Sequence, residues 1–313
     1  MLILRPTIYE RVFRPLLFLL PPEAAQKTAD FLLKRKPIWS ILEPRLRILD
    51  DRLKTSLGGI NLENPIGLAA GYDKNCSLLP SLASLGFGYV IGGTVTESPR
   101  PGNVKPRVIR NVRTEALLNS LGFPSYGLDA VENNLLKNEP ATNQTPFIVS
   151  NSGISDEEII NCHNRLEANV AAIELNISSP NTKGLKVFQS PEALINLLNQ
   201  INEIRKKPLF VKLPPYGFNL ERDSAEQENV LELAKVCKGL GIDGLTIANT
   251  WPVKDKRLAS GTGGLSGKSI FEDTLRMVSE IRHEVGQNTY INASGGIFSG
   301  DDAWKALNAG ANT

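Results

Sequence analysis

Between residue 65 and residue 309, seven short apolar runs alternate with seven stretches of helical pattern, and this rhythm leaves few possible folds. The runs are apolar without alternation, as expected for parallel strands that are buried on both faces. Repeated strand–helix units predict either a doubly wound sheet or a closed barrel. The expected strands are Pro65–Ala70, Gly88–Gly92, Phe147–Ser150, Val170–Asn176, Leu209–Leu213, Gly244–Ala248 and Tyr290–Ala293, and the helices lie near 76–86, 125–138, 155–168, 190–206, 223–240, 269–285 and 301–309.

The polar residues of this region gather where the expected strands end, which favours a (β/α)8 TIM barrel. In such barrels the ligand lies across the carboxyl ends of the strands. Neither a GxGxxG turn nor a GxxxxGKS loop follows a strand, so binding of a nicotinamide dinucleotide or a nucleoside triphosphate is weakly supported. Residues Ala309–Thr313 have the composition of an approach to an eighth strand. We therefore expect a barrel that lacks its last strand in this chain and exposes strand edges.

The composition excludes several classes of function. Among 313 residues, 35 are basic and 33 acidic, and a net charge of +2 gives no basic excess for nucleic acid. The three cysteines are scattered and form no CxxC pair, which is typical of unpaired thiols in a reducing compartment. With two histidines, neither in a metal-binding spacing, a metal site and a Ser-His-Asp triad are both poorly supported.

Residues 1–40 differ from the rest and are treated as a separate domain, with the barrel over 41–313. Apolar residues recur at helical spacing until Pro21-Pro22, and a second helix is expected from Glu23 until Pro37 closes it. The longest apolar run, Leu16–Leu20, is far shorter than the ~20 residues of a spanning helix. Such helices suit a membrane surface or a partner groove, or else dock on the chain's own barrel. Residues 41–60 are expected to be a connector into a hairpin that turns at Gly58-Gly59.

The stretch Asn176–Leu185 is the most informative motif in the chain. It follows an expected strand and contains amides and hydroxyls, which do not build an apolar core. At the carboxyl end of a barrel strand, such groups are placed to hydrogen-bond a ligand.

Two lysines stand beside other expected strands. Lys74 follows the first strand in Ala69–Asn75, where small residues let a planar ligand approach the backbone and the cation could meet an anion. Alternatively this is an ordinary turn in which Asp73 caps the next helix. Lys212 lies inside an apolar strand, and burying it requires a bound anion, an electron-rich ring or an internal carboxylate.

Three further segments complete the pattern of polar strand ends. The insertion that returns at Leu118–Pro124 is expected to form a lid or a surface hairpin, and Asn119 would be unusual in a core unless it bonds something. Two glycine loops, Thr262–Gly267 and Asn292–Ile297, are expected to expose backbone amides that could cradle a phosphate.

Taken in order, the motifs AAGYDKN, GGTVT, PRPGN, LLNSLGF, NISSPNTKGL, VKLPP, ANT, TGGLSGK and SGGI closely resemble those of the dihydroorotate dehydrogenase family. The resemblance covers residues from about 5 to 313 and points to class 2, the quinone-dependent and membrane-associated type. Class 1 members resemble this chain but carry a cysteine where Ser179 stands.

The resemblance implies oxidation of (S)-dihydroorotate to orotate in de novo pyrimidine biosynthesis, with FMN as hydride acceptor and a quinone as final electron acceptor. Ser179 matches the catalytic base. Residues 1–40 match a two-helix quinone tunnel on the membrane. The residues that match substrate-binding positions are Lys74, Asn119, Ser120, Leu121, Gly122, Phe123, Asn176, Asn181, Asn249 and Thr250, and those that match the FMN site are Ala70, Gly71, Thr94, Asn151, Asn176, Lys212, Ala248, Gly267 and Gly296.

Two departures from the family pattern qualify these expectations. Ala248 stands where many relatives have threonine, although a backbone contact to the flavin could survive that change. The last family strand carries a Tyr-Ser/Thr pair that completes the phosphate site, and the chain ends before it, so weakened FMN binding is expected.

The alternatives to a quinone-dependent dehydrogenase are a class 1-type FMN barrel that uses fumarate or NAD, or a truncated, inactive chain that associates with membranes.

The expected location follows from the N-terminal segment. Without a transit-like leader, it favours peripheral attachment to the cytoplasmic side of a bacterial cell membrane, or to the mitochondrial inner membrane in a eukaryote. The expected state is a monomer that binds dihydroorotate and quinone but no nucleic acid and no metal.

Overall fold

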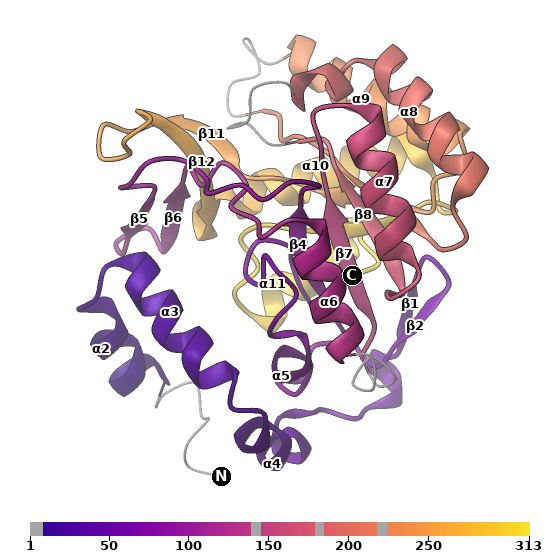
Figure 1. Ribbon diagram of the computed structural model, residues 1–313. Helices are drawn as coiled ribbons and strands as arrows, with labels where there is room; N and C mark the ends of the chain where they lie inside the picture. Colours follow the sequence, from indigo (N-terminus) through magenta and orange to yellow (C-terminus); the bar gives the residue numbers. More distant parts are fainter. Residues whose placement is uncertain (1–8, 139–144, 179–184, 218–223) are drawn as a thin grey trace.

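A curved parallel sheet of seven strands forms the centre of the molecule (Figure 1). The computed structural model describes residues 9–138, 145–178, 185–217 and 224–313. The seven strands fall on the seven runs expected from the sequence, each followed by a helix. In spatial order they are β3 (Gly67–Leu68), β4 (Tyr89–Val95), β7 (Phe147–Asn151), β8 (Ala172–Asn176), β9 (Leu209–Lys212), β10 (Gly244–Ile247) and β13 (Tyr290–Ala293).

The helices cover the outer face of this sheet, where buried leucine, isoleucine and valine side chains from both layers form the main core. Each expected helix between residues 76 and 309 is present. Their bounds are α5 (Leu79–Ala83), α6 (Leu128–Asn138), α7 (Asp156–Glu167), α8 (Pro191–Ile204), α9 (Ser224–Gly239), α10 (Phe271–Val285) and α11 (Gly300–Asn308).

The sheet curls far enough for its distant strands to meet through their side chains. The hydroxyl of Tyr89, on β4, donates a hydrogen bond of 2.8 Å to Asn292 Oδ1, on β13, although four strands separate β4 from β13 in the sheet. The segment expected to approach a further strand lies against β13, where Asn312 N donates to Ile291 O at 2.7 Å. The sheet therefore has the curvature of a TIM-type barrel.

A small hairpin fills the amino-terminal end of this curved sheet. The strands β1 (Thr55–Leu57) and β2 (Ile60–Leu62) turn at Gly58 and Gly59, which both have positive φ, as the sequence predicted. Leu57 and Leu62 are buried against inward-facing side chains of the barrel strands, including Phe210. With this end plugged, the carboxyl ends of the strands remain for a ligand.

A four-stranded antiparallel sheet lies over the opposite end, in the order β11 (Trp251–Lys254), β12 (Thr262–Gly267), β6 (Ala116–Asn119) and β5 (Val108–Asn111). The insertion therefore forms a hairpin, β5–β6, which was one of the two expectations. The predicted glycine loop at Thr262–Gly267 is wrong, because these residues form β12. Its glycines allow close approach: a Cβ at Gly264 would lie 1.9 Å from Thr250 Oγ1.

The N-terminal segment packs beside the β5–β6 hairpin (Figure 1). It comprises a π-helical turn at Tyr9–Phe13, then α2 (Arg14–Phe18) and α3 (Pro22–Leu33). The connector predicted from residue 41 is wrong at its start, because a further helix, α4, runs from Lys36 to Leu46. Pro37 lies in the first turn of this helix instead of ending the previous one, because the backbone N–H groups of a first turn have no partner within the helix. No helix in the described residues is both long and apolar enough to span a bilayer.

Candidate active site

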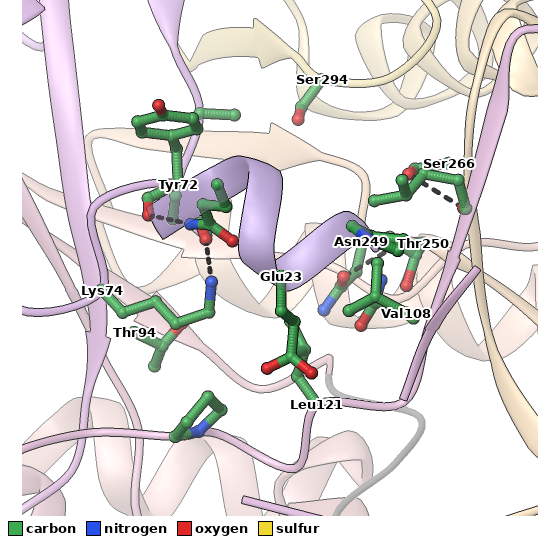
Figure 2. Close-up of a pocket in the computed structure, with 18 of the residues that line it drawn as sticks. Glu23, Tyr72, Lys74, Thr94, Val108, Leu121, Asn249, Thr250, Ser266 and Ser294 are labelled. Carbon is green, nitrogen blue, oxygen red and sulfur yellow. Dashed lines mark hydrogen bonds between the residues drawn. The ribbon is translucent and has the colours of Figure 1, made fainter. Parts of the chain in front are cut away.

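A cavity of about 590 Å³ lies between the carboxyl ends of the barrel strands and the N-terminal helices. Its walls come from the loop after β3, the ends of β4, β8, β9 and β10, the hairpin β5–β6, and helices α2 and α3. Figure 2 shows Lys74, Thr94, Asn249 and Thr250 around the same space as Glu23 of α3. One cavity therefore joins the barrel top to the N-terminal segment.

Asn176, the last residue of β8, is held in one orientation by its neighbours. Its Nδ2 donates to Thr94 Oγ1 at 2.9 Å, and its Oδ1 accepts from the Ser178 hydroxyl at 2.9 Å and the Ser178 N–H at 3.1 Å. Asn176 is 4% exposed and lines the cavity. Because these bonds fix which atom is the amide nitrogen, Asn176 presents a defined donor edge to the cavity.

Ser178 connects this amide to a second one on the next wall. Asn249 Nδ2 donates to Ser178 Oγ at 3.0 Å, and Asn249 Oδ1 accepts from Thr250 N at 2.7 Å. Asn249 and Thr250 both line the cavity, whereas Ser178 is buried behind them. This chain of hydrogen bonds places amides from β8 and from the end of β10 around one ligand.

Lys212, at the end of β9, brings a positive charge into the cavity wall. The residue is 6% exposed. Among the described residues, none forms a hydrogen bond or an ion pair with its ammonium group. A buried cation with no partner in the described parts of the chain agrees with a bound anion or an electron-rich ring, two of the three possibilities that the sequence left open.

Lys74, in the loop after β3, supplies a second cation to the cavity wall. Its ammonium group donates to Gly71 O, and burial lowers its pKa, against the opposing charge of Asp30. The neighbouring Asp73 accepts from Ser77 N at 3.0 Å and Leu78 N at 2.7 Å, so it also caps the turn before α5. The two expectations for this loop are therefore compatible, because Asp73 does the capping while Lys74 faces the cavity.

Small residues form the floor between the two lysines. The cavity wall includes Ala69, Ala70, Gly71 and Gly93. Beyond the Cα of Gly71, which has a φ of +118°, there is open space, so a ligand can approach its backbone closely. A flat floor with a buried cation and fixed amides fits the isoalloxazine ring of a flavin, which is planar and accepts negative charge on reduction.

The structure brings most of the predicted site residues together and leaves some outside. Asn151 points away from the cavity, because its Nδ2 donates to Ile159 O in α7. Ser120, Gly267 and Gly296 are also outside the cavity lining, and Ser179 and Asn181 lie outside the described residues. The predicted residues that line the cavity are Ala70, Gly71, Lys74, Thr94, Asn119, Leu121, Gly122, Phe123, Asn176, Lys212, Ala248, Asn249 and Thr250.

Sequence reasoning missed several residues of the site. Ser178 belongs to the motif after β8, but its role as a link between two amides depends on contacts across the barrel. Glu23 and Gln26 also line the cavity, and helical spacing alone did not single them out. No group of three or more His, Cys, Asp or Glu side chains in the described parts of the chain could hold a metal ion.

A TIM-type barrel with a buried cation, fixed amides and a floor of small residues at its strand ends fits the class of flavin-dependent oxidoreductases. Comparison with known families agrees, since the family described as Dihydroorotate dehydrogenase matches residues 52–313. The chain belongs to the dihydroorotate dehydrogenase family.

Individual relatives support the same assignment over nearly the whole chain. Dihydroorotate dehydrogenase (quinone) of Coxiella burnetii is 34% identical over 318 residues, which cover 96% of this chain and 89% of the relative. The protein of the same description from Sinorhizobium medicae is 34% identical over 325 residues, covering 96% and 84%. The crystal structure of DHODH from Eimeria tenella in complex with ferulenol superposes with a TM-score of 0.81 at 28% identity, covering 95% of this chain and 88% of that one.

Proposed function

We propose that this chain oxidises (S)-dihydroorotate to orotate in pyrimidine biosynthesis, with FMN as the cofactor and a quinone as the electron acceptor. The observation that carries this proposal is the single cavity shared by the barrel and the N-terminal helices. Its deep part is lined by Lys212 and Asn176, whereas its outer part is lined largely by apolar residues such as Leu17, Phe18 and Ala25, with Glu23 and Gln26 beside them. A polar floor suits a flavin and a pyrimidine, and an apolar vestibule suits a quinone.

The chain's own residues would hold the FMN ring by its edges and its face. Gly71 and Ala70 let the ring approach the backbone, Thr94 and Asn176 are placed beside it, and Lys212 would stabilise negative charge on it. When bound, FMN supplies the acceptor for the hydride that leaves dihydroorotate. The phosphate would meet backbone amides near Gly296, where a φ of +74° and Phe271 at 2.7 Å from a Cβ position exclude a side chain.

The substrate would lie between the amides and Lys74. A dihydropyrimidine ring offers donors and acceptors, and the amides of Asn119, Asn176 and Asn249 can match both. Lys74 would pair with the substrate carboxylate. Ser179 is the proposed base that removes the proton from C5, and because a hydroxyl is a weak base it must pass the proton on to water or to a neighbouring hydroxyl.

The proposal is tested by following flavin absorbance in the purified protein without oxygen. Dihydroorotate should bleach the flavin bands and a quinone should restore them. Ser179→Ala should keep the flavin but slow the bleaching by at least about 100-fold at neutral pH, the range of general base catalysis. Ser56→Ala, at the plugged end of the barrel, is the matched control and should bleach at the normal rate. Absence of flavin bands after FMN is added would refute the assignment.

We also propose peripheral attachment to a membrane through the N-terminal helices, on the cytoplasmic side in a bacterium. The support is a group of exposed apolar side chains on this segment, among them Leu16 at 59% and Leu19 at 81% exposure, next to Arg14. Exposed apolar groups flanked by arginine favour binding to an anionic lipid surface.

Sedimentation with phosphatidylglycerol-containing vesicles tests this attachment. The double variant Leu16→Ser/Leu19→Ser should lower the vesicle partition coefficient by about 100-fold or more, because each serine removes about 1.5–3 kcal/mol of apolar burial in the lipid. Leu136→Ser, at an exposed leucine on α6, should leave sedimentation unchanged. Equal binding of all three proteins would show that the N-terminal helices do not mediate attachment.

A further inference from the structure

Arg107, the residue before β5, joins helix α3 to the residues that come just before Arg107 in the sequence. Its Nε and Nη2 donate to Glu23 Oε1, at 3.1 and 2.9 Å, and Glu23 is in the first turn of α3. Its Nη1 donates to the carbonyls of Pro101, at 2.8 Å, and Asn103, at 3.1 Å. A single guanidinium with 13% of its side chain exposed therefore fixes the path of residues 101–107, which we name the bridging segment.

The bridging segment in turn holds the loop Asn119–Phe123, named here the substrate loop. Asn103 N donates to Leu121 O at 2.9 Å, and Asn103 Nδ2 donates to Ser120 O at 3.0 Å and to Ser120 Oγ at 3.3 Å. In the other direction, Ser120 N donates to Arg107 O at 2.8 Å. The two segments are thus joined by both backbone and side-chain hydrogen bonds.

The backbone of the substrate loop needs this support. Gly122 has a φ of +68°, and a Cβ there would lie 2.4 Å from Asn103 Oδ1. Phe123 has a φ of +53°, which is uncommon for an aromatic residue. Such conformations persist where surrounding contacts determine them, and here the contacts include the hydrogen bonds of Asn103 to Ser120 and Leu121 and the packing of Phe123 against the main core.

The charge on Glu23 keeps this connection in place at neutral pH. Burial raises the pKa of the Glu23 carboxyl, but the hydrogen bonds and charges of Arg107 and Lys105 outweigh burial and bring the pKa below its usual value. Lys105 is the weaker partner, at 3.6 Å and with 60% of its side chain exposed. Within the described parts of the chain, Lys105 forms no hydrogen bond to the substrate loop, so it offers a matched control.

We propose that Glu23 and Arg107 are positioning residues that hold the substrate loop in its binding conformation. Docking of α3, on the side of the cavity proposed for the quinone, then supports binding of the pyrimidine on the opposite side. The assignment of this loop to the substrate rests on the proposed function. The linkage is reciprocal: a pyrimidine bound against the loop stabilises the docked position of α3. Neither residue takes part in the chemical step.

Glu23→Gln and Arg107→Lys in the flavin-loaded protein test the proposal. Each should weaken orotate binding, measured by calorimetry, by about 5- to 20-fold, which is an ordinary coupling between two sites. The KM for dihydroorotate should rise by a similar factor, while kcat changes by less than about twofold, because a positioning contact acts on binding. Lys105→Gln should leave both constants within about twofold. The effect of the double variant should be less than the product of the single effects, since both remove one contact.

Hydrogen exchange separates failure of this proposal from failure of the proposed function. In Glu23→Gln and in Arg107→Lys, the amides of residues 119–123 should exchange faster than in the wild-type protein, whatever the substrate is. Unchanged exchange there overturns the proposal. Unchanged orotate affinity in the two variants, when the wild-type protein does bind orotate, overturns it as well. If the wild-type protein binds no orotate and the two variants still exchange faster in this loop, the positioning role of Glu23 and Arg107 is supported. Only the assignment of the loop to the substrate is then refuted.

Discussion

At the scale of the residue, Lys212 shows how far sequence reasoning reaches into the site. A lysine within an apolar strand indicated a ligand or an internal carboxylate, and the structure gives its ammonium group no ion-pair partner among the described residues. The sequence could not have indicated Arg107 or Ser178 in the same way. Their roles come from hydrogen bonds to Glu23 and Asn249, which are 84 and 71 residues away in the chain.

Lys212→Met should have opposite effects on flavin binding and on the stability of the flavin-free protein. Losing the cation should weaken FMN binding at least about tenfold, because a hydrogen bond to a charged partner contributes roughly 1.5–3 kcal/mol. In the flavin-free protein, methionine removes a buried charge that has no partner among the described residues, and should leave the free energy of unfolding unchanged or higher. Flavin fluorescence titration and urea unfolding measure the two effects. Destabilisation of the flavin-free protein would show that Lys212 has a protein partner.

At the scale of the element, the central sheet was predictable because its strands are buried on both faces and leave continuous apolar runs in the sequence. The elements outside the central sheet were less predictable. Strand β12 contains three glycines in six residues and pairs with β6 through tertiary contacts, which no local pattern encodes. Helix α4 was missed because Pro37 suggested the end of a helix, yet Pro37 occupies the first turn of α4.

Arg110, on β5, anchors the N-terminal helices to the hairpin. Its Nη1 donates to Leu20 O at 2.9 Å, and its guanidinium lies 4.7 Å from the centre of the Phe18 ring. Arg110→Gln should therefore loosen α2 and α3 by about 1 kcal/mol, because it removes a charge-assisted hydrogen bond and a cation–π contact.

Limited proteolysis and hydrogen exchange check the Arg110 prediction. Residues 14–33 should be cleaved and exchanged several-fold faster in Arg110→Gln, whereas strands β7 to β10 should be unchanged. Arg113→Gln, at an exposed arginine in the turn of the same hairpin, is the control and should behave like the wild-type protein. Faster exchange throughout the barrel would mean that Arg110 stabilises the whole fold instead of one docked segment.

At the scale of the whole molecule, the N-terminal helices and the barrel meet around the cavity, so the site depends on both. The position of each barrel motif at a strand end followed from the topology of repeated strand–helix units. How the N-terminal helices face the barrel did not follow, because it depends on contacts such as Glu23–Arg107 that join distant parts of the chain. The resulting arrangement gives the deep polar floor and the outer apolar wall a common space.

Stability of the whole molecule should fall in mildly acidic solution because of His163. This side chain is 1% exposed on α7, and its nearest charged group, Glu167, already accepts from the N–H groups of Lys206 and Lys207. Burial lowers the pKa of His163 below 6.5, and Glu167 only partly opposes this, while the Arg205 charge adds to it. Below about pH 6.5 the unfolded chain therefore binds a proton that the folded chain does not, and the free energy of unfolding decreases as pH falls.

His163→Leu should remove that part of the acid sensitivity. Between about pH 7.5 and 5.5, the wild-type protein should lose up to about 1.4 kcal/mol more stability than the variant, the limit for one pH unit below the unfolded-state pKa. Urea unfolding at both pH values measures the difference, and using each protein as its own reference cancels the packing cost of leucine. The chain's other histidine, His283, is exposed on α10, so His283→Leu should keep the wild-type pH dependence. Parallel losses in all three proteins would place the acid-sensitive group elsewhere, and a loss abolished by His283→Leu would contradict the role of burial.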